Sequence, residues 1–132
     1  MKMTKKRILV VDDERDFVEM LKLRLEASGY EVIPAFDGIQ GVSFASRKKP
    51  DLILLDVMMP AGSGYLVCER LKMSSSTRSI PIIFLTAKSQ PEDEAKAYSV
   101  GAKYFLTKPY EPELLLETVE EALESSEELG SE

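Results

Sequence analysis

The sequence predicts an α/β domain built on a parallel β-sheet with helices on both faces. Runs of large aliphatic residues without polar alternation indicate strands buried on both sides, and they occur at 8–11, 52–55 and 82–85. Segments with the helical spacing of apolar residues alternate with these runs. The connections are short, as strand–helix–strand units require, so we expect five strands alternating with five helices.

The first half of the chain supplies two strands and two helices. After the strand at 8–11, a helix starting near Glu14 and stopping at Gly29 has an apolar face made of Phe17, Val18, Leu21 and Leu25. The strand at 31–35 contains Pro34, which cannot donate a ladder hydrogen bond, so we expect it at a sheet edge. Asp37 can cap the next helix, whose expected inward residues are Ile39, Val42 and Ala45.

The strand at 52–55 ends at Asp56 and leads into a loop containing Pro60, Gly62 and Gly64. The following helix is expected to turn Leu66, Val67 and Leu71 inward, and Cys68 to behave as a small core or near-surface residue. The run at 82–85 then ends at Thr86.

The last part of the chain begins with a helix at Pro91 that has few apolar residues. Its expected inward residues are Ala95 and Tyr98, so this helix should be among the more easily displaced elements. A final strand at 103–107 ends at Lys108, and the last helix, from Pro112, carries Leu115, Val119, Ala122 and Leu123. We expect one domain over 1–124 and a short disordered acidic tail over 125–132.

Composition excludes several classes of protein. The 132 residues are 44% hydrophobic and 30% charged, as in an ordinary soluble globule. Nine Glu and no Lys or Arg lie between Glu111 and Glu132, so the net charge of −6 belongs to the C-terminal segment, and no basic stripe indicates direct nucleic-acid binding. The absence of histidine excludes His-based triads, His-containing zinc sites and phosphohistidine. A single cysteine forms no internal disulfide, and no apolar stretch is long enough for a membrane, so a cytoplasmic protein is expected.

Polar side chains follow the predicted strands at their carboxyl ends: Asp12, Asp13, Asp56, Thr86 and Lys108. Each has a simple alternative explanation, such as a helix cap, a turn or a solvated lysine. In open parallel sheets, however, the carboxyl ends of the strands form the edge where ligands bind. The concurrence of all five at that edge favours a functional site.

The chemistry of these five side chains indicates a phosphoryl-transfer site. Three neighbouring carboxylates repel one another, and one lysine offsets only part of that charge. Mg²⁺ prefers carboxylate oxygens, waters and phosphate oxygens, so a divalent ion would stabilise such a group. One carboxylate can then act as the nucleophile that takes a phosphoryl group as an acyl phosphate, and Asp56 is the candidate because it follows the central strand.

Five segments resemble the response-regulator receiver domains of two-component signalling, of the chemotaxis-receiver type. They are ILVVDDE at 8–14, DLILLDVMMP at 51–60 with Gly64, PIIFLTA at 81–87, Gly101-Ala102 and Lys108-Pro109. The resemblance covers about residues 6–123, and although each segment alone is a weak signal, the ordered set is specific. It implies a flavodoxin-like, doubly wound sheet with strand order 2-1-3-4-5.

The resemblance also implies roles for individual residues. Asp56 would be the phosphoacceptor, and Lys108, joined to Pro109 by a cis bond, would contact the phosphoryl group. Mg²⁺ (or Mn²⁺) would be held by Asp12, Asp13, Asp56 and the backbone carbonyl of Met58. Thr86 would move to the phosphoryl oxygen and Phe105 would turn inward with it, with Phe replacing a common Tyr. Met58 and Lys88 would flank the access of water and tune the lifetime of the phosphorylated form.

The implied partners are a histidine kinase or phosphotransfer protein and a downstream protein. The downstream protein would bind a face formed by 91–100, 103–105 and 110–117, and a phosphorylation-dependent homodimer is a further expectation. The protein would not be an enzyme beyond self-phosphorylation and self-dephosphorylation.

Alternative interpretations of the whole chain also stay open. A free-standing receiver is favoured because no linker toward a DNA-binding domain is recognisable after Glu111. The others are the receiver fragment of a longer regulator with an output domain and a pseudo-receiver scaffold that is never phosphorylated. A phosphohydrolase is disfavoured because Met58 replaces the second Asp of aspartate-nucleophile phosphatases, and an ATPase because no GxxxxGK[ST] motif is present.

Overall fold

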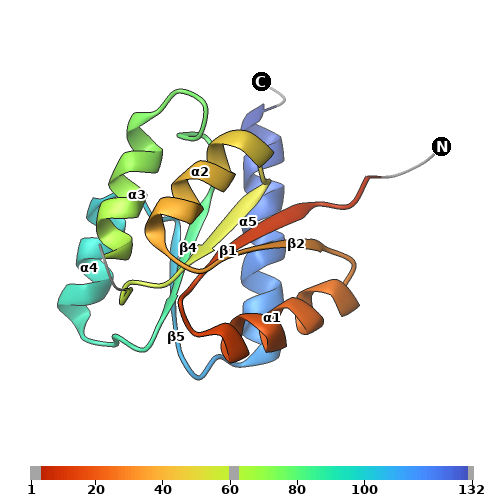
Figure 1. The fold of residues 1–132 in the computed structure, drawn as a ribbon, viewed down its shortest axis with the longest axis horizontal. Helices are drawn as coiled ribbons and strands as arrows, with labels where there is room; N and C mark the ends of the chain where they lie inside the picture. The colour runs from red at the N-terminus through yellow and green to blue at the C-terminus, as the bar shows by residue number, and fades with distance from the viewer. Residues whose placement is uncertain (1–3, 60–62, 131–132) are drawn as a thin grey trace.

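The computed structural model describes residues 4–59 and 63–130 and contains a five-stranded parallel sheet in the order β2-β1-β3-β4-β5. The predicted fold and strand order are therefore confirmed (Figure 1). The strands are β1 (Arg7–Val11), β2 (Glu31–Ala35), β3 (Leu52–Leu55), β4 (Ile82–Thr86) and β5 (Tyr104–Thr107). The helices are α1 (Arg15–Ala27), α2 (Gly38–Lys48), α3 (Gly64–Met73), α4 (Pro91–Ser99) and α5 (Pro112–Gly130). Pro60 and Gly62 of the predicted loop lie outside the described residues.

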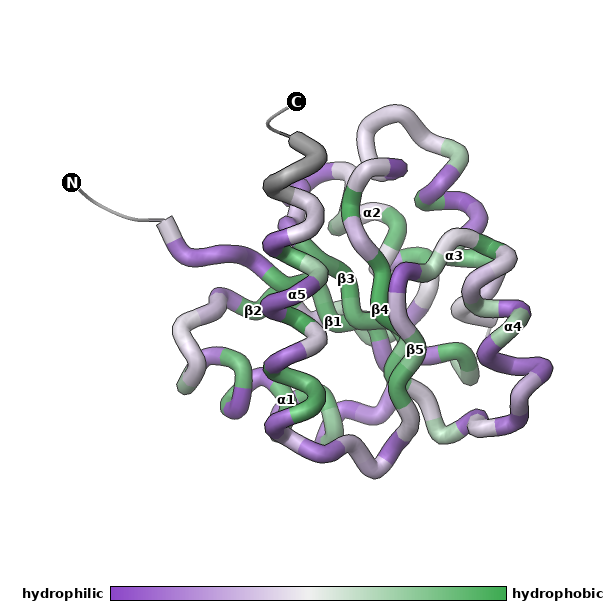
Figure 2. The backbone as a smooth tube through the Cα atoms, turned by 180° about the vertical axis from the view of Figure 1, so that it is seen from behind, coloured by the Kyte–Doolittle hydropathy of each residue, from purple (hydrophilic) through white to green (hydrophobic). Residues whose placement is uncertain are grey.

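The helices cover both faces of the sheet, which produces two hydrophobic cores. Because side chains alternate along a strand, Leu9 and Ile53 face α2, α3 and α4, whereas Ile8 and Leu52 face α1 and α5. All four residues of β3 are buried, as expected for a central strand with helices on both sides. Figure 2 shows the corresponding concentration of hydrophobic residues along the central strands.

The edge position predicted for the Pro34 strand is confirmed. β2 lies at one end of the sheet and pairs only with β1 among the described strands, with Pro34 opposite Val10. Proline lacks a backbone N–H and cannot donate to a neighbouring strand, and at the sheet edge no second neighbouring strand requires that donor.

Two of the four apolar faces predicted for α1, α2, α3 and α5 are confirmed in full. α1 buries Val18, Leu21 and Leu25 with Phe17 half-buried, and α5 buries the residues predicted for it. Two predictions were wrong: Ile39 on α2 and Leu66 on α3 are exposed by 76% and 49%. α2 instead approaches the sheet through Gly41, where an added Cβ would lie 2.9 Å from a Val11 methyl, so the helix is rotated and Ile39 turns outward.

The prediction for α4 was right about its weak apolar face and wrong about the residues. Ala95 and Tyr98 are exposed, and Ala97 alone of the nine described residues of α4 is buried. The inward stripe continues one turn later at the half-buried Val100, whose backbone carbonyl accepts a hydrogen bond from the Cys68 thiol. α4 therefore has little hydrophobic anchoring.

The last helix is longer than the sequence predicts. α5 continues to Gly130, past residue 124 where the domain was expected to end, and 131–132 lie outside the described residues. The boundary between domain and tail stays a prediction. None of the helices in the described part of the chain is long and apolar enough to cross a membrane.

Candidate functional site

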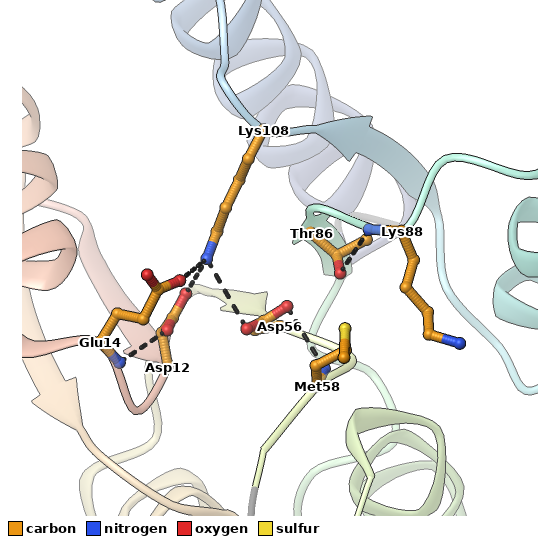
Figure 3. A network of polar contacts seen from close by, with 7 residues as sticks. All are labelled: Asp12, Glu14, Asp56, Met58, Thr86, Lys88 and Lys108. Carbon is orange, nitrogen blue, oxygen red and sulfur yellow. Dashed lines mark hydrogen bonds and ion pairs between the residues drawn. The ribbon is translucent and has the colours of Figure 1, made fainter.

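The carboxyl ends of four strands bring the predicted polar residues to one edge of the sheet. Asp12 follows β1, Asp56 follows β3, Thr86 ends β4 and Lys108 follows β5. Figure 3 shows Asp12, Asp56 and Lys108 pointing toward one another, with Thr86 on the far side of Asp56. Residues separated by up to 96 positions in the chain thus share one site.

Three carboxylates form the acidic part of the site. Asp12, Asp13 and Asp56 each offer an oxygen within 4.8 Å of the others. Asp12 and Asp56 are only 2% and 5% exposed, whereas Asp13 is open to solvent. Burial raises the pKa of Asp12, because a charged carboxylate loses hydration there, although a hydrogen bond from Lys108 opposes the shift.

The Lys108 ammonium is the counter-charge of this cluster. Its Nζ donates to Asp12 Oδ2 and to Glu14 Oε1, both at 2.8 Å, and lies 3.6 Å from Asp56 Oδ2. The ammonium also lies 4.1 Å from the centre of the Phe17 ring. Burial disfavours the charge on Lys108, but the bonds to Asp12 and Glu14 outweigh that effect and raise the pKa of the ammonium.

Glu14 and Phe17 were not predicted as site residues. Glu14 is mostly exposed and binds Lys108 from the start of α1, and Phe17 supplies an aromatic surface beneath the same ammonium. The acidic run Asp12-Asp13-Glu14 was the available signal for Glu14. Phe17 gave none, because its helical spacing already explained it as a core residue.

Backbone contacts fix the position of Asp56. Its carboxylate Oδ1 accepts from the Met58 backbone N–H at 3.4 Å, and its own N–H donates to Val11 O at 3.0 Å. Gly64 at the start of α3 donates to Val57 O at 2.8 Å. A Cβ on Gly64 would overlap with the Asp56 carbonyl oxygen, so only glycine allows α3 to begin this close to the loop.

The two predicted switch residues lie in different surroundings. Thr86 is fully buried, and its hydroxyl accepts a hydrogen bond from the Lys88 backbone N–H at 3.3 Å rather than bonding Asp56. Lys108 N donates to Thr86 O at 2.8 Å, which ties the two strand ends together, and the Lys108–Pro109 bond is cis as predicted. Phe105 is half-buried and packs against the core under α2, α3 and α4.

Comparison with known families decides what kind of domain carries this site. The family model of the response regulator receiver domain matches residues 8–120. The chain belongs to the response-regulator receiver family. Within this receiver, the residues assembled at the carboxyl edge come from the same segments that predicted the resemblance.

Curated relatives of the receiver are longer proteins. It is 41% identical over 113 residues to the DNA-binding dual master transcriptional regulator RpaA of Synechocystis sp., covering 86% of this chain and 47% of that protein. It is 43% identical over 122 residues to the alkaline phosphatase synthesis transcriptional regulatory protein PhoP of Bacillus subtilis, covering 92% and 50%. The chain therefore spans about half the length of these relatives.

Solved structures resemble the receiver over nearly their full length. The chemotaxis protein CheY4 of Vibrio cholerae superposes with a TM-score of 0.85 at 34% identity, covering 90% of this chain and 99% of that one. The receiver domain of a signal transduction histidine kinase from Syntrophus aciditrophicus superposes with a TM-score of 0.84 at 38% identity, covering 91% of each chain.

The donor set of the receiver fits a hard divalent cation. Carboxylate oxygens from three aspartates lie close enough to share one ion, and oxygen ligands are those that Mg²⁺ and Mn²⁺ prefer. Asp13 gives the cluster a solvent-facing side from which an ion can arrive. The backbone carbonyl of Met58 as a further ligand stays a prediction.

Proposed function

We propose that this receiver takes a phosphoryl group onto Asp56 from a histidine kinase or phosphotransfer protein in the cytoplasm. The observation that carries the proposal is the buried Asp56 carboxylate, which lies beside two other aspartates and 3.6 Å from a lysine ammonium. Carboxylates gathered so closely repel one another unless cations offset their charge, and the same cations would attract a phosphoryl group.

In the proposed reaction, an oxygen of Asp56 attacks phosphorus while the bond from phosphorus to the donor nitrogen breaks. The donor histidine leaves with that electron pair, and Asp56 holds an acyl phosphate. Asp12 and Asp13, with Asp56, would hold Mg²⁺ (or Mn²⁺). When bound, this ion supplies positive charge that offsets the charge of the transferring group.

Lys108 would offset the remaining negative charge of the transferring phosphoryl group. In the resting arrangement its ammonium is shared between Asp12 and Glu14. Its ammonium lies 3.6 Å from Asp56 Oδ2 and would therefore be close to a phosphoryl group carried by Asp56. Glu14 is exposed and therefore exchanges this bond for water at little cost.

The switch would be a shift between two arrangements of the turn that follows β4. Thr86 would leave its bond with the Lys88 backbone and donate a hydrogen bond from its hydroxyl to a phosphoryl oxygen. Phe105 would turn further inward as Thr86 moves. The phosphoryl group biases this equilibrium only by its difference in affinity for the two arrangements. The weak apolar anchoring of α4 supports a role in this change.

Met58 and Lys88 are proposed to control the lifetime of the acyl phosphate. Met58 is 57% exposed and lies two residues after Asp56, and Lys88 lies two residues after Thr86. Met58 would limit the approach of water to phosphorus directly, whereas the Lys88 side chain points away from Asp56 in the resting arrangement and would have to turn toward the site to do so. Catalysis would be confined to self-phosphorylation from small donors and self-dephosphorylation.

The output would be protein binding through α4, β5 and α5, including a phosphorylation-dependent homodimer. A second candidate is the receiver part of a longer regulator, because the relatives named as transcriptional regulators are about twice as long as this chain. DNA binding would in that case belong to the additional domain and not to the receiver.

Intact-mass measurement after incubation with acetyl phosphate tests the proposal. One added phosphate is expected, dependent on Mg²⁺ and absent in Asp56→Asn. The variant Asp51→Asn is the matched control: Asp51 is a half-buried aspartate at the opposite end of β3, and this variant should still be phosphorylated. No added mass in the wild type at any Mg²⁺ concentration would favour a pseudo-receiver scaffold instead.

A further inference from the structure

Asp93, the third residue of α4, is the centre of a group of polar contacts outside the acidic site. Its carboxylate accepts from the Tyr65 hydroxyl at 3.4 Å and from the Gln90 backbone N–H at 3.2 Å, and lies 3.7 Å from the Lys88 ammonium. Its backbone carbonyl also accepts from the Tyr65 hydroxyl at 3.2 Å. The Asp93 side chain is only 15% exposed, so these contacts are partly shielded from solvent.

Tyr65 connects Asp93 to the segment between β3 and α3, which begins with Asp56. It follows Gly64, whose backbone abuts the Asp56 carbonyl too closely for any other residue. The Tyr65 ring is 7% exposed and packs at 5.5 Å from the Phe84 ring, two residues before Thr86. The Lys96 ammonium lies 4.7 Å from the Tyr65 ring centre. Tyr65 is therefore a well-packed residue of α3 that contacts α4 through its hydroxyl and its ring.

Lys88 connects Asp93 to the turn that carries Thr86. Its backbone N–H donates to Thr86 Oγ1 at 3.3 Å, and its ammonium pairs with Asp93. Figure 3 shows the Lys88 side chain running away from Asp56. The same residue thus holds the Thr86 hydroxyl at one end and the start of α4 at the other.

We propose that Tyr65, Asp93 and Lys88 form a latch that keeps the Thr86 turn in its resting arrangement. Tyr65 and Asp93 would be positioning residues that lower the affinity of Asp56 for a phosphoryl group by acting through Lys88 and Thr86. The inference rests on the proposed phosphorylation of Asp56. None of the latch residues belongs to the acidic cluster itself.

The latch should weaken phosphoryl binding, because its contacts are present in the resting arrangement. α4 buries Ala97 alone among its described residues, so polar contacts supply a large share of what holds its first turn. Contacts made only in the resting arrangement raise the free-energy difference between the two arrangements. A ligand that binds only the other arrangement then has a lower apparent affinity, reduced by the same factor as the population of that arrangement. Loss of a latch contact therefore strengthens phosphoryl binding.

Tyr65→Phe is the sharpest variant because it removes the hydroxyl and keeps the ring that packs on Phe84. Loss of one hydrogen bond of this kind corresponds to about a five-fold change in an equilibrium. Tyr30→Phe is the matched control, since Tyr30 precedes β2 at the amino-terminal end of the sheet, opposite to the edge that carries Thr86, and packs against the other hydrophobic core.

The experiment titrates beryllofluoride, a phosphoryl stand-in, in the presence of Mg²⁺ and follows the Thr86 amide by NMR. Tyr65→Phe is expected to bind about five-fold more tightly than wild type, with Tyr30→Phe unchanged. Asp93→Asn keeps an acceptor for the Tyr65 hydroxyl but loses the ion pair with Lys88, so it should tighten binding as well. The double variant should gain less than the two separate effects predict, because both contacts belong to one network. Equal affinities of wild type and Tyr65→Phe would overturn the latch.

Amide hydrogen exchange in the resting protein tests the latch independently of the proposed phosphorylation. Residues 86–90 should exchange about five-fold faster in Tyr65→Phe than in wild type, and unchanged exchange would overturn the latch even if Asp56 binds the probe. If the wild type binds no beryllofluoride, the proposed function fails, and the exchange rates alone then decide whether the latch exists.

Discussion

Replacing Lys108 by Met should destabilise the fold and do so in a pH-dependent way. The substitution leaves Asp12 and Asp56, 2% and 5% exposed, without the ammonium that lies between them. Removing one partner of a buried ion pair costs about 3 kcal/mol in the free energy of unfolding. The bond to Glu14 adds little, because that side chain is 63% exposed.

The sign of the pH dependence follows from Asp12. Burial already raises the pKa of Asp12 above its ordinary value of 3.8, and the Lys108 hydrogen bond is the main opposing influence. Without Lys108 the folded-state pKa lies further above the unfolded value. Stability is then fully present below the unfolded pKa and is lost as pH rises through the folded pKa, so the deficit of Lys108→Met should grow from pH 4 to pH 7.

Urea unfolding of wild type and Lys108→Met at several pH values measures this deficit. Lys88→Met is the control: its ion pair with Asp93 spans 3.7 Å with 42% of the lysine side chain exposed, so its loss should cost less than about 1 kcal/mol. Adding Asp12→Asn to Lys108→Met should recover much of the lost stability. A deficit equal to that of Lys88→Met, or one independent of pH, would show that Lys108 does not offset the charge of Asp12 and Asp56.

Three further outcomes are expected. Gly64→Ala should lower the free energy of unfolding by about 2 kcal/mol or more. The effect should exceed that of Gly38→Ala, because a Cβ on Gly64 meets backbone atoms whereas one on Gly38 meets a valine methyl at 2.8 Å. Equal urea midpoints of the two variants would contradict this. Burial raises the pKa of the Cys68 thiol to about 11, so its reaction with a disulfide reagent at pH 8 should be about a hundred-fold slower than that of the urea-unfolded chain; comparable rates would argue against its burial. Millimolar Mg²⁺ should raise the urea midpoint of the wild type, and Asp13→Asn should remove most of that rise, since Asp13 is exposed and its loss spares the core; an undiminished rise would exclude Asp13 as a ligand.

The fold could be predicted because both hydrophobic patterning and backbone chemistry act locally. Buried strands appear as continuous aliphatic runs, and Pro34 marks an edge strand whatever surrounds it. The orientation of helices was less predictable. Ile39 and Leu66 fit an inward stripe by spacing, but close approach at Gly41 sets the rotation of α2, and close approach is a property of two elements together.

The site was predictable to the extent that its residues end strands. Strand ends meet at one edge by topology, so Asp12, Asp56 and Lys108 could be brought together without coordinates. Contacts that depend on how the helices are placed could not be predicted. Glu14, the residue before α1, reaches Lys108, and Tyr65 of α3 reaches Asp93 of α4, 28 residues later in the chain. Nothing in the local sequence of either residue indicates its partner.

Phosphorylation of Asp56 is tested by identifying which carboxylate becomes an acyl phosphate. Borohydride reduction of the protein treated with acetyl phosphate and Mg²⁺ converts an aspartyl phosphate to homoserine, which peptide mass spectrometry locates. Homoserine is expected at residue 56 alone. Homoserine at Asp12 or Asp13, or at no position, would contradict it.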